Sequence, residues 1–159
     1  MSIAKKLKDY LEENHVSYTH SSHRLAYTAR EVAAAQHISG WELAKTVVLK
    51  ADDQFVMIVL PAVTKIDWKE LYDQLPFRQL ELATEKELAS LFPDSELGAM
   101  APFGTLYNLP VYVDIGLAVK NEIVFNAGSH VETIRMNYKD FERLVQPKLI
   151  HAAPVTAQA

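Results

Sequence analysis

The chain contains no cysteine, and this absence excludes a whole group of chemistries. Disulfide bonds, thiolate nucleophiles, sulfur-ligated zinc and iron–sulfur clusters all require cysteine side chains. Glycine is scarce as well, with five residues scattered along the chain, so the glycine-rich phosphate loop of nucleotide-binding proteins is absent. No apolar run approaches the roughly 20 residues of a membrane-spanning helix, and the first residues carry charge too early for a secretory signal. We therefore expect a soluble, cytoplasmic protein.

A basic excess is also missing. The chain has 16 Lys and Arg residues against 20 Asp and Glu residues, which gives a formal net charge of −4. Proteins that follow a long stretch of nucleic-acid backbone usually carry a clear positive excess, because each neutralised phosphate needs a cation. Extended duplex binding is therefore not expected, whereas a local contact with one end of a nucleic acid needs only a few charges. The six histidines, chiefly His20 and His23, lack zinc-site spacing, so we expect no metal and no cofactor.

Length and composition favour a single globular domain. The 159 residues are 49% hydrophobic and 23% charged, which suits one well-formed core rather than a disordered chain. We expect one domain over residues 1–150. A flexible tail is expected over 151–159, because the end of the chain is rich in alanine and lies beyond Pro147.

Hydrophobic periodicity predicts that helices and strands alternate along the chain. Expected helices are 3–14, 29–37, 67–74, 84–92 and 137–145, and expected strands are 16–20, 44–51, 54–60, 78–82, 111–115, 122–126 and 133–136. Thr28 with Glu31 and Thr84 with Glu87 form capping boxes, and a tight turn at 51–53 predicts an antiparallel hairpin. About seven strands and five helices indicate an α/β (α+β) fold: a mixed, mostly antiparallel curved sheet or partial barrel flanked by helices.

Lys45 is the first candidate functional residue. In the run 45–50, the alternation of a strand places Lys45, Val47 and Leu49 on one face and Thr46, Val48 and Lys50 on the other. Only Lys45 then shares its face with two apolar side chains, so its ammonium group could look into an apolar pocket. The alternative is a lysine that extends along the surface at the end of a strand.

The small-residue loop 98–104 is the second candidate. Its small side chains leave the backbone N–H groups of Ala99, Met100 and Ala101 accessible, and Pro102 stiffens the exit. Such amides can point at a carbonyl oxygen or a phosphate. The alternative is a plain structural crossing loop.

The turn 126–130 is the third candidate. Ser129 and His130 suggest a nucleophile and its base, but neighbouring residues of an extended segment point to opposite faces. We therefore expect no Ser–His–carboxylate triad. Either side chain can still line a pocket and bind a substrate group.

Four segments, taken together, resemble the YbaK/prolyl-tRNA-synthetase-associated editing-domain family. They are HRLAYTAREVA (23–33), LAKTVVLK (43–50), GAMAPFG (98–104) and AGSH (127–130). The resemblance runs over roughly residues 3–146, and its specificity lies in the order and spacing of the segments rather than in any one of them. It implies a compact mixed α/β domain that hydrolyses the ester between a wrongly attached amino acid and tRNA, often as a free-standing trans-editing factor.

The resemblance also implies roles for individual residues. The lysine that matches Lys45 is the hallmark functional residue of the family, and the loop that matches Gly98 to Pro102 closes over the aminoacyl group. The implied catalytic residues are Lys45, Gly98, Ala99, Met100 and Ala101. The implied substrate-binding residues are Tyr27, Thr28, Thr46, Val47, Pro102, Phe103, Gly128, Ser129 and His130. Many members carry serine where this loop has Ala99 and Ala101, which removes hydroxyl assistance but leaves the backbone dipoles.

The leading hypothesis is an aminoacyl-tRNA deacylase that removes a small amino acid, with tRNA(Pro) as the first candidate substrate. An aminoacyl ester is already activated, so positioning a water and stabilising the oxyanion are sufficient. A pocket walled by Val47, Leu49 and Met100 would admit only small amino acids. The implied partners are the aminoacylated tRNA acceptor end and a synthetase, without a membrane. The alternative is a non-catalytic module that binds an aminoacyl-like or nucleotide-like ligand, or regulates a synthetase.

Overall fold

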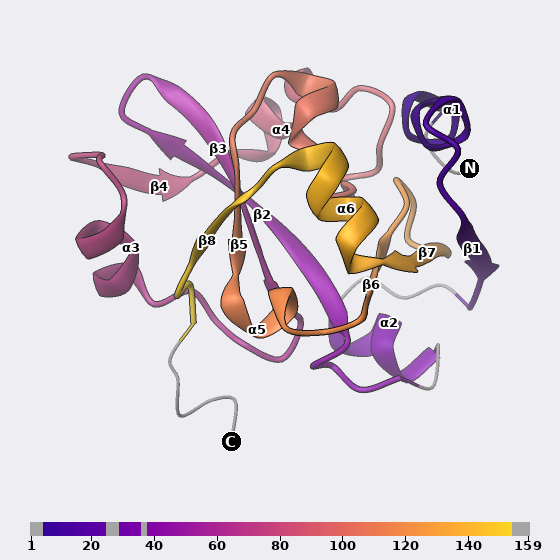
Figure 1. The fold of residues 1–159 in the computed structure, drawn as a ribbon. Coiled ribbons are helices and arrows are strands. Elements are labelled where there is room, and N and C mark those ends of the chain that lie inside the picture. Colours follow the sequence, from indigo (N-terminus) through magenta and orange to yellow (C-terminus); the bar gives the residue numbers. More distant parts are fainter. Residues whose placement is uncertain (1–4, 25–28, 36–37, 154–159) are drawn as a thin grey trace.

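The computed structural model describes residues 5–24, 29–35 and 38–153, and within them the chain forms six α-helices and eight strands (Figure 1). The helices are α1 (Lys5–Glu13), α2 (Ala29–Ala35), α3 (Trp68–Gln74), α4 (Glu85–Leu91), α5 (Ile115–Ala118) and α6 (Tyr138–Val145), with a 3₁₀ turn at Gly104–Tyr107. The strands are β1 (Tyr18–Ser22), β2 (Leu43–Ala51), β3 (Gln54–Pro61), β4 (Leu80–Leu82), β5 (Val111–Asp114), β6 (Glu122–Asn126), β7 (Glu132–Asn137) and β8 (Lys148–Ile150). None of the helices in these ranges is long and apolar enough to cross a membrane.

Two helices begin where the sequence predicts. The Thr84 hydroxyl accepts a hydrogen bond from the Glu87 backbone N–H, and the Glu87 carboxylate accepts one from the Thr84 N–H, so the capping box of α4 is complete. The Asp67 carboxylate accepts a hydrogen bond from the Glu70 N–H at the start of α3. Both caps satisfy backbone donors that the first helical turn cannot pair internally. The predicted box at Thr28 lies outside the described residues.

All eight strands belong to one mixed sheet in the order β1-β7-β6-β2-β3-β5-β8, with β4 paired to β2. The predicted hairpin is confirmed, because β2 and β3 pair antiparallel from Ala44 with Pro61 to Ala51 with Gln54. β2 also pairs in parallel with β6, as β3 does with β5 and β5 with β8. The expected mixed, mostly antiparallel sheet is therefore confirmed, with four antiparallel and three parallel strand pairs.

Residues 148–153 are more ordered than the composition of this region suggests. β8, which the sequence analysis did not predict, pairs with β5 at the edge of the sheet. Beyond it, the Ala152 N–H donates to the Asp114 carboxylate at 2.8 Å, and both Ala152 and Ala153 are buried. Residues 151–153 of the expected flexible tail therefore pack against the domain, and 154–159 lie outside the described residues.

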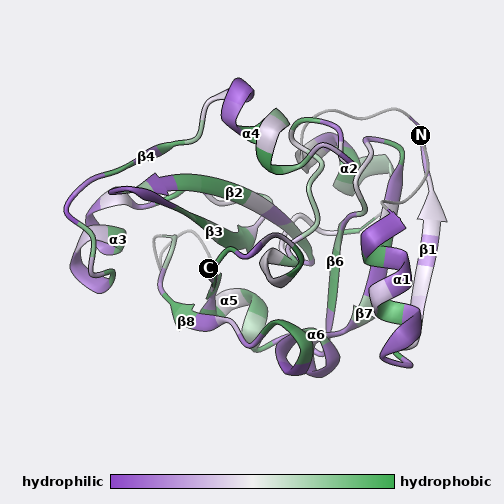
Figure 2. Cartoon of the chain, turned by 90° about the horizontal axis from the view of Figure 1, so that it is seen from above, coloured by the Kyte–Doolittle hydropathy of each residue, from purple (hydrophilic) through white to green (hydrophobic). Residues whose placement is uncertain are grey.

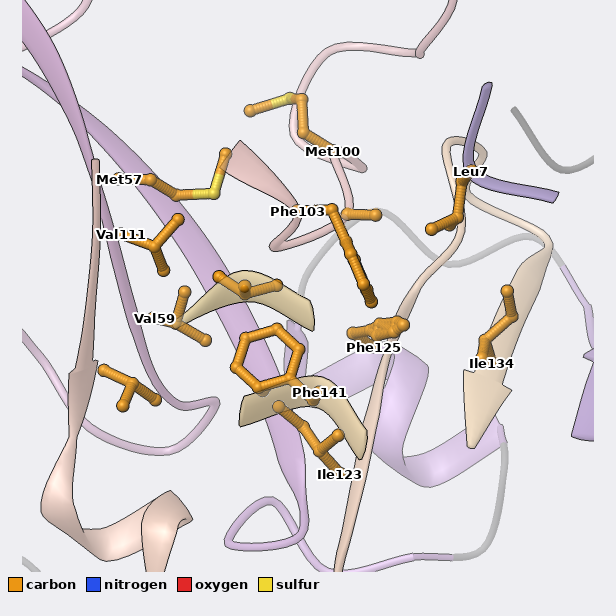
Figure 3. Packing of buried hydrophobic residues seen from close by; sticks show 14 of the residues in the cluster. Leu7, Met57, Val59, Met100, Phe103, Val111, Ile123, Phe125, Ile134 and Phe141 are labelled. Carbon is orange, nitrogen blue, oxygen red and sulfur yellow. The ribbon is translucent and has the colours of Figure 1, made fainter. Parts of the chain in front are cut away.

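The strand alternation of β2 and β3 gives the sheet two buried faces. We call the face with Ala44, Val48, Met57 and Val59 the aromatic face, because Phe103, Phe125 and Phe141 pack in the same cluster (Figure 3). We call the opposite face of β2, with Leu43, Lys45, Val47 and Leu49, the lysine face. In Figure 2 much of β2 and β6 is coloured hydrophobic, whereas the edge strand β1 is pale or hydrophilic. The centre of the sheet is thus covered on both sides.

Candidate functional site

Lys45 lies on the central strand β2 and is half-buried. Its Nζ donates a hydrogen bond to the backbone carbonyl of Thr64, in the segment that follows β3. Thr64 is itself buried, and its hydroxyl donates to the Pro61 carbonyl at 2.7 Å. The ammonium group of Lys45 is therefore held against ordered backbone, rather than extending freely from a strand end.

The lysine face is covered by two separate helices, and Lys45 lies between them. At one end, Leu43 packs in a cluster with Val32 and Ala33 of α2. At the other end, Leu49 packs in a cluster with Leu71 of α3. A lysine between two such clusters has apolar neighbours along the strand on both sides, which favours tight interactions between its charge and any polar group nearby.

The small-residue loop and the turn after β6 are held together directly. The Gly128 N–H donates to the Ala99 carbonyl at 2.9 Å, and the Glu96 N–H donates to the Gly128 carbonyl at 2.8 Å. The His130 N–H donates to the Glu96 carboxylate at 2.6 Å, and the His130 ring nitrogen Nε2 lies 2.7 Å from the Leu97 carbonyl. Two of the three predicted site segments are thus one hydrogen-bonded unit.

The same unit is connected to the strand that carries Lys45. β6 pairs in parallel with β2 at Leu43 with Val124 and Ala44 with Phe125, and the turn 127–130 begins two residues beyond Phe125. The start of the turn is one strand away from Lys45 and about one residue further along the sheet. Strand residues are about 3.3 Å apart, so this second displacement is small. The topology of the sheet therefore brings all three segments to one region.

One of the three expected amides is not available. The Ala99 N–H donates to the Glu96 carbonyl at 3.0 Å, so it cannot also receive a developing negative charge. Within the described part of the chain, the Met100 and Ala101 amides have no hydrogen-bond acceptor, although both residues are buried. Unpaired buried amides are rare in folded proteins. The bend before them uses Gly98 at φ +83°, a conformation that disfavours side chains.

Several expected substrate contacts are corrected by packing. Met100 belongs to the cluster of the aromatic face, whereas Leu49 is fully buried on the lysine face, so the expected wall of Val47, Leu49 and Met100 does not form. Phe103 is also fully buried, with its ring centroid 5.5 Å from Phe125 and 5.4 Å from Phe141. It is a core residue rather than a substrate contact.

The remaining predicted contacts differ in position. Val47 is half-buried on the lysine face, whereas Thr46, also half-buried, alternates to the other side of β2. Pro102 is buried. Tyr27 and Thr28 lie outside the described residues.

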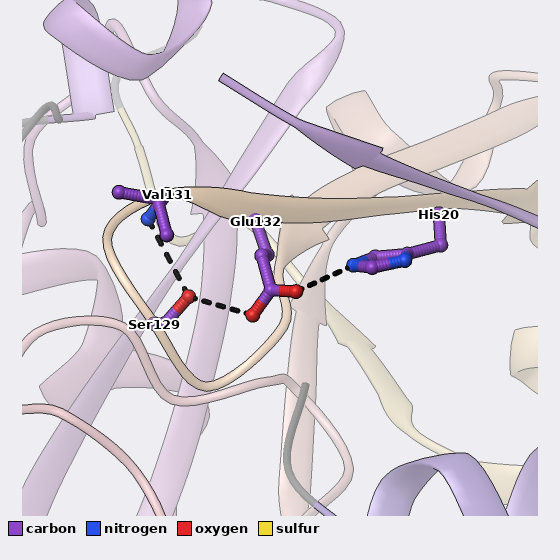
Figure 4. A network of polar contacts seen from close by, with 4 residues as sticks. All are labelled: His20, Ser129, Val131 and Glu132. Atoms are coloured by element: carbon purple, nitrogen blue, oxygen red, sulfur yellow. Dashed lines mark hydrogen bonds and ion pairs between the residues drawn. The ribbon is translucent and has the colours of Figure 1, made fainter. Parts of the chain in front are cut away.

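The sequence predicts that Ser129 and His130 do not act as a nucleophile and its base, and the contacts of Ser129 agree with this prediction. The Ser129 hydroxyl is fully buried and donates to Glu132 Oε2 at 3.0 Å, while Glu132 Oε1 lies 2.8 Å from His20 Nε2 (Figure 4). A catalytic triad needs the histidine between the serine and the carboxylate, whereas here the carboxylate is in the middle. Ser129 therefore anchors the turn to β7 and β1.

The long loop that contains the candidate amides is closed by a partly buried hydrogen bond. The Tyr107 hydroxyl donates to the two carboxylate oxygens of Asp94 at 2.9 and 3.1 Å. Burial raises the pKa of Tyr107 far above its ordinary value, and the hydrogen bond to Asp94 raises it further. The hydroxyl thus remains a donor over the whole range in which proteins are usually stable, and the loop 93–108 is fixed at both ends.

Two residues near the site were missed by the sequence analysis. Glu96 connects the loop to the turn through its backbone and its carboxylate, and nothing in its local sequence indicates this. Asn126 is the last residue of β6, where its position suggested only turn chemistry. The alternation of β6 could have identified it, because Asn126 follows Val124 at a spacing of two residues, and Val124 packs with Leu43 on the lysine face.

The described part of the chain contains no group of three or more His, Asp or Glu side chains that could hold a metal ion.

The model of the aminoacyl-tRNA editing domain family matches residues 23–144. This range contains Lys45, the loop 98–102 and the turn 127–130. A comparison with curated proteins finds no match.

Solved structures share the fold at low sequence identity. A hypothetical protein matches with a TM-score of 0.84 and 14% identity, over 94% of this chain and 100% of that one. A candidate trans-editing enzyme for prolyl-tRNA synthetase matches with a TM-score of 0.80 and 20% identity, over 95% and 96%. Part of a candidate signal transduction protein from Marinobacter aquaeolei matches with a TM-score of 0.77 and 17% identity, over 98% of this chain and 32% of that one.

Proposed function

The chain belongs to the aminoacyl-tRNA editing-domain family, and we propose that it hydrolyses the ester bond of mischarged aminoacyl-tRNA. The family match covers most of the chain and includes every segment of the candidate site. The observation that carries the proposal is the half-buried Lys45, held against the Thr64 carbonyl between the clusters of α2 and α3. A fixed cation in apolar surroundings suits the anionic, hydroxyl-rich end of a tRNA.

In the proposed reaction, a water molecule attacks the carbonyl carbon of the aminoacyl ester. The resulting tetrahedral oxyanion collapses, the bond to the ribose oxygen breaks, and a proton is transferred from the attacking water to that oxygen. The products are the free amino acid and uncharged tRNA. Lys45 holds the terminal ribose or its phosphate, and the Met100 and Ala101 amides meet the oxyanion. Fixed donors of this kind typically contribute on the order of 10²–10³ in rate.

The substrate and partners belong to the same proposal. We expect a small amino acid, because the Gly128 N–H holds the Ala99 carbonyl at 2.9 Å, and this close packing of the loop against the turn leaves little room beside them. The structural match to a candidate trans-editing enzyme for prolyl-tRNA synthetase makes tRNA(Pro) the first tRNA to test and a synthetase the first protein partner. Residues 1–150 would act as one domain, in the cytoplasm.

The test is a deacylation assay with a panel of mischarged tRNAs, led by alanyl-tRNA(Pro). We expect the wild-type protein to accelerate hydrolysis at catalytic concentrations, and Lys45→Ala to lose at least about 100-fold in kcat/KM. Lys139→Ala, at an exposed lysine of α6, is the matched control and should keep full activity. A wild-type protein that cleaves no substrate of the panel, or a fully active Lys45→Ala variant, would refute the proposal.

A second candidate is a module that binds an aminoacyl-like ligand without hydrolysing it. It is favoured by the engaged Ala99 amide and by the alanines in the loop, which leave fewer groups for chemistry. A non-hydrolysable amide analogue of aminoacyl-adenosine separates the two candidates in calorimetry. Binding without turnover of the corresponding ester supports the module, and steady turnover excludes it.

A further inference from the structure

Asn126 and Lys45 point to the same face of the sheet from two neighbouring strands. The parallel register pairs Leu43 with Val124 and Ala44 with Phe125, and Leu43 and Val124 pack in the same cluster. One step further along both strands, Lys45 and Asn126 point to that same face, because side chains alternate. Paired strands are about 4.8 Å apart, and Lys45 and Asn126 each lie one residue beyond the last registered pair, Ala44 with Phe125, so their side chains start close to each other. In Figure 1, β6 comes close to β2 at the end of β2 that lies near α2.

The amide oxygen of Asn126 is an unused acceptor. Asn126 Oδ1 is buried and, among the described residues, has no hydrogen-bond partner. A buried carbonyl oxygen without a donor is energetically costly, so such atoms are usually paired. The Lys45 ammonium does not supply this bond, because it points to Thr64, which follows β3 on the other side of β2.

A hydroxyl group is the ligand that fits between these two side chains. It can donate to Asn126 Oδ1 and accept from the Lys45 ammonium at the same time. An ammonium group of the substrate would satisfy Asn126 but would be repelled by Lys45, and a phosphate would satisfy Lys45 but could not donate to Asn126. Under the proposed function, the hydroxyl nearest the scissile ester is the free vicinal hydroxyl of the terminal ribose.

We propose that Asn126 binds the free ribose hydroxyl next to the aminoacyl ester, opposite Lys45, and so orients the ester for attack. This inference rests on the proposed function. In this proposal Asn126 accepts a hydrogen bond and therefore prefers a substrate group that can donate one. A hydrophobic or purely structural residue at the end of β6 would have no such preference.

The test is a cycle between Asn126 variants and a modified substrate. Alanyl-tRNA(Pro) is prepared with the ester on the 3′ oxygen and with either a hydroxyl or a fluorine at the 2′ position of the terminal adenosine. Fluorine retains weak acceptor character but cannot donate. The variants are Asn126→Ala and Asn126→Leu, which lack the acceptor, and Asn126→Asp, which retains one. Asn121→Ala, at an exposed asparagine just before β6, is the matched control. Thermal unfolding of each variant verifies that it is folded.

We expect the wild-type protein to lose about tenfold in kcat/KM when the hydroxyl is replaced by fluorine, since a hydrogen bond of this kind is worth about one power of ten. Asn126→Ala and Asn126→Leu should lose about tenfold on the hydroxyl substrate and nothing further on the fluorinated one. Asn126→Asp should keep the discrimination between the two substrates, and Asn121→Ala should match the wild type.

Two results would overturn the inference and are distinguishable from each other. If the wild-type protein is active but the effects of Asn126→Ala and of fluorine multiply, Asn126 does not contact that hydroxyl. If the wild-type protein hydrolyses neither substrate nor any other mischarged tRNA, the proposed function fails and the inference fails with it.

Discussion

The two faces of β2 are formed by alternate residues of one nine-residue strand, and they differ in how they are covered. The aromatic face is continuous, because Ala44 and Val48 pack into one cluster with Phe103, Phe125 and Phe141. The lysine face is interrupted, because α2 covers Leu43 and α3 covers Leu49, with Lys45 between them. Continuous apolar packing on one face stabilises the fold. A gap between two apolar clusters on the other face leaves a place where polar groups can bind a ligand. The division predicts that substitutions on the two faces will separate stability from activity.

The largest expected effect is on the aromatic face. Phe103→Ala should lower the free energy of unfolding by about 3–5 kcal/mol, because a fully buried aromatic ring leaves a cavity that the neighbouring rings cannot fill. Urea unfolding measures it. Leu82→Ala, at a residue 60% exposed on β4, is the control and should change stability by less than about 0.5 kcal/mol. A cost below 1 kcal/mol for Phe103→Ala, about the limit for a surface site, would return Phe103 to the list of substrate contacts.

A charged residue at the rim of the aromatic face gives the next effect. Glu132→Ala should cost about 1–3 kcal/mol, because it leaves the buried Ser129 hydroxyl and His20 without their shared partner. Glu122→Ala is the control: Glu122 is exposed and its ion-pair partner Arg135 is partly exposed, so the change should stay within about 1 kcal/mol. Chemical unfolding compares them, and equal costs would contradict the structural role of the network in Figure 4.

On the lysine face the order of the two effects is reversed. Lys45→Met removes the hydrogen bond to Thr64 but keeps the length of the side chain, so it should cost only about 1 kcal/mol of stability. Deacylation should nevertheless fall by at least about 100-fold. Unfolding curves and kcat/KM measured on one preparation test the comparison. A loss of activity no larger than the loss of folded protein would remove the distinction between the faces.

The smallest effect is a gain. The Tyr138 hydroxyl is buried in the aromatic cluster without a partner among the described residues, so Tyr138→Phe should stabilise the fold by up to about 1 kcal/mol. Burial, and then Glu142, raise the pKa of Tyr138 from 10.0 to about 12. Because the folded-state pKa is the higher one, the wild type should lose stability as the pH rises from 10 to 12, and the variant should lose less. Absorbance titration of tyrosine and unfolding at each pH provide the measurements, and a destabilised variant would indicate a missing partner.

The elements that the sequence predicted well depend on few and nearby residues. The box of Thr84 and Glu87 and the hairpin of β2 and β3 are each specified within a short segment, and both are confirmed. β8 was missed because three residues after a proline have no local signal, and the strand exists through its pairing with the distant β5. Local chemistry is visible in a sequence, whereas pairing between distant segments is not.

The candidate site also has features that the sequence predicts and features that depend on contacts between distant segments. Lys45 could be selected from residue type and alternation, and the family assignment from the order of the segments is confirmed by the match over 23–144. The engagement of the Ala99 amide by Glu96 could not be predicted, because it depends on how the loop folds back. Asn126 was missed for a related reason: its importance lies in the neighbour that the parallel register gives it.

The sequence by itself determined the family, most of the helices and strands, and the fact that a lysine shares one strand face with apolar residues. Only the tertiary structure decided that α2 and α3 leave Lys45 between them, that Asn126 of the neighbouring strand shares its face, and that Met100 packs on the opposite face. The physical reason is that alternation along a strand fixes which side chains share a face. The groups that cover that face come from distant segments, and their packing selects them.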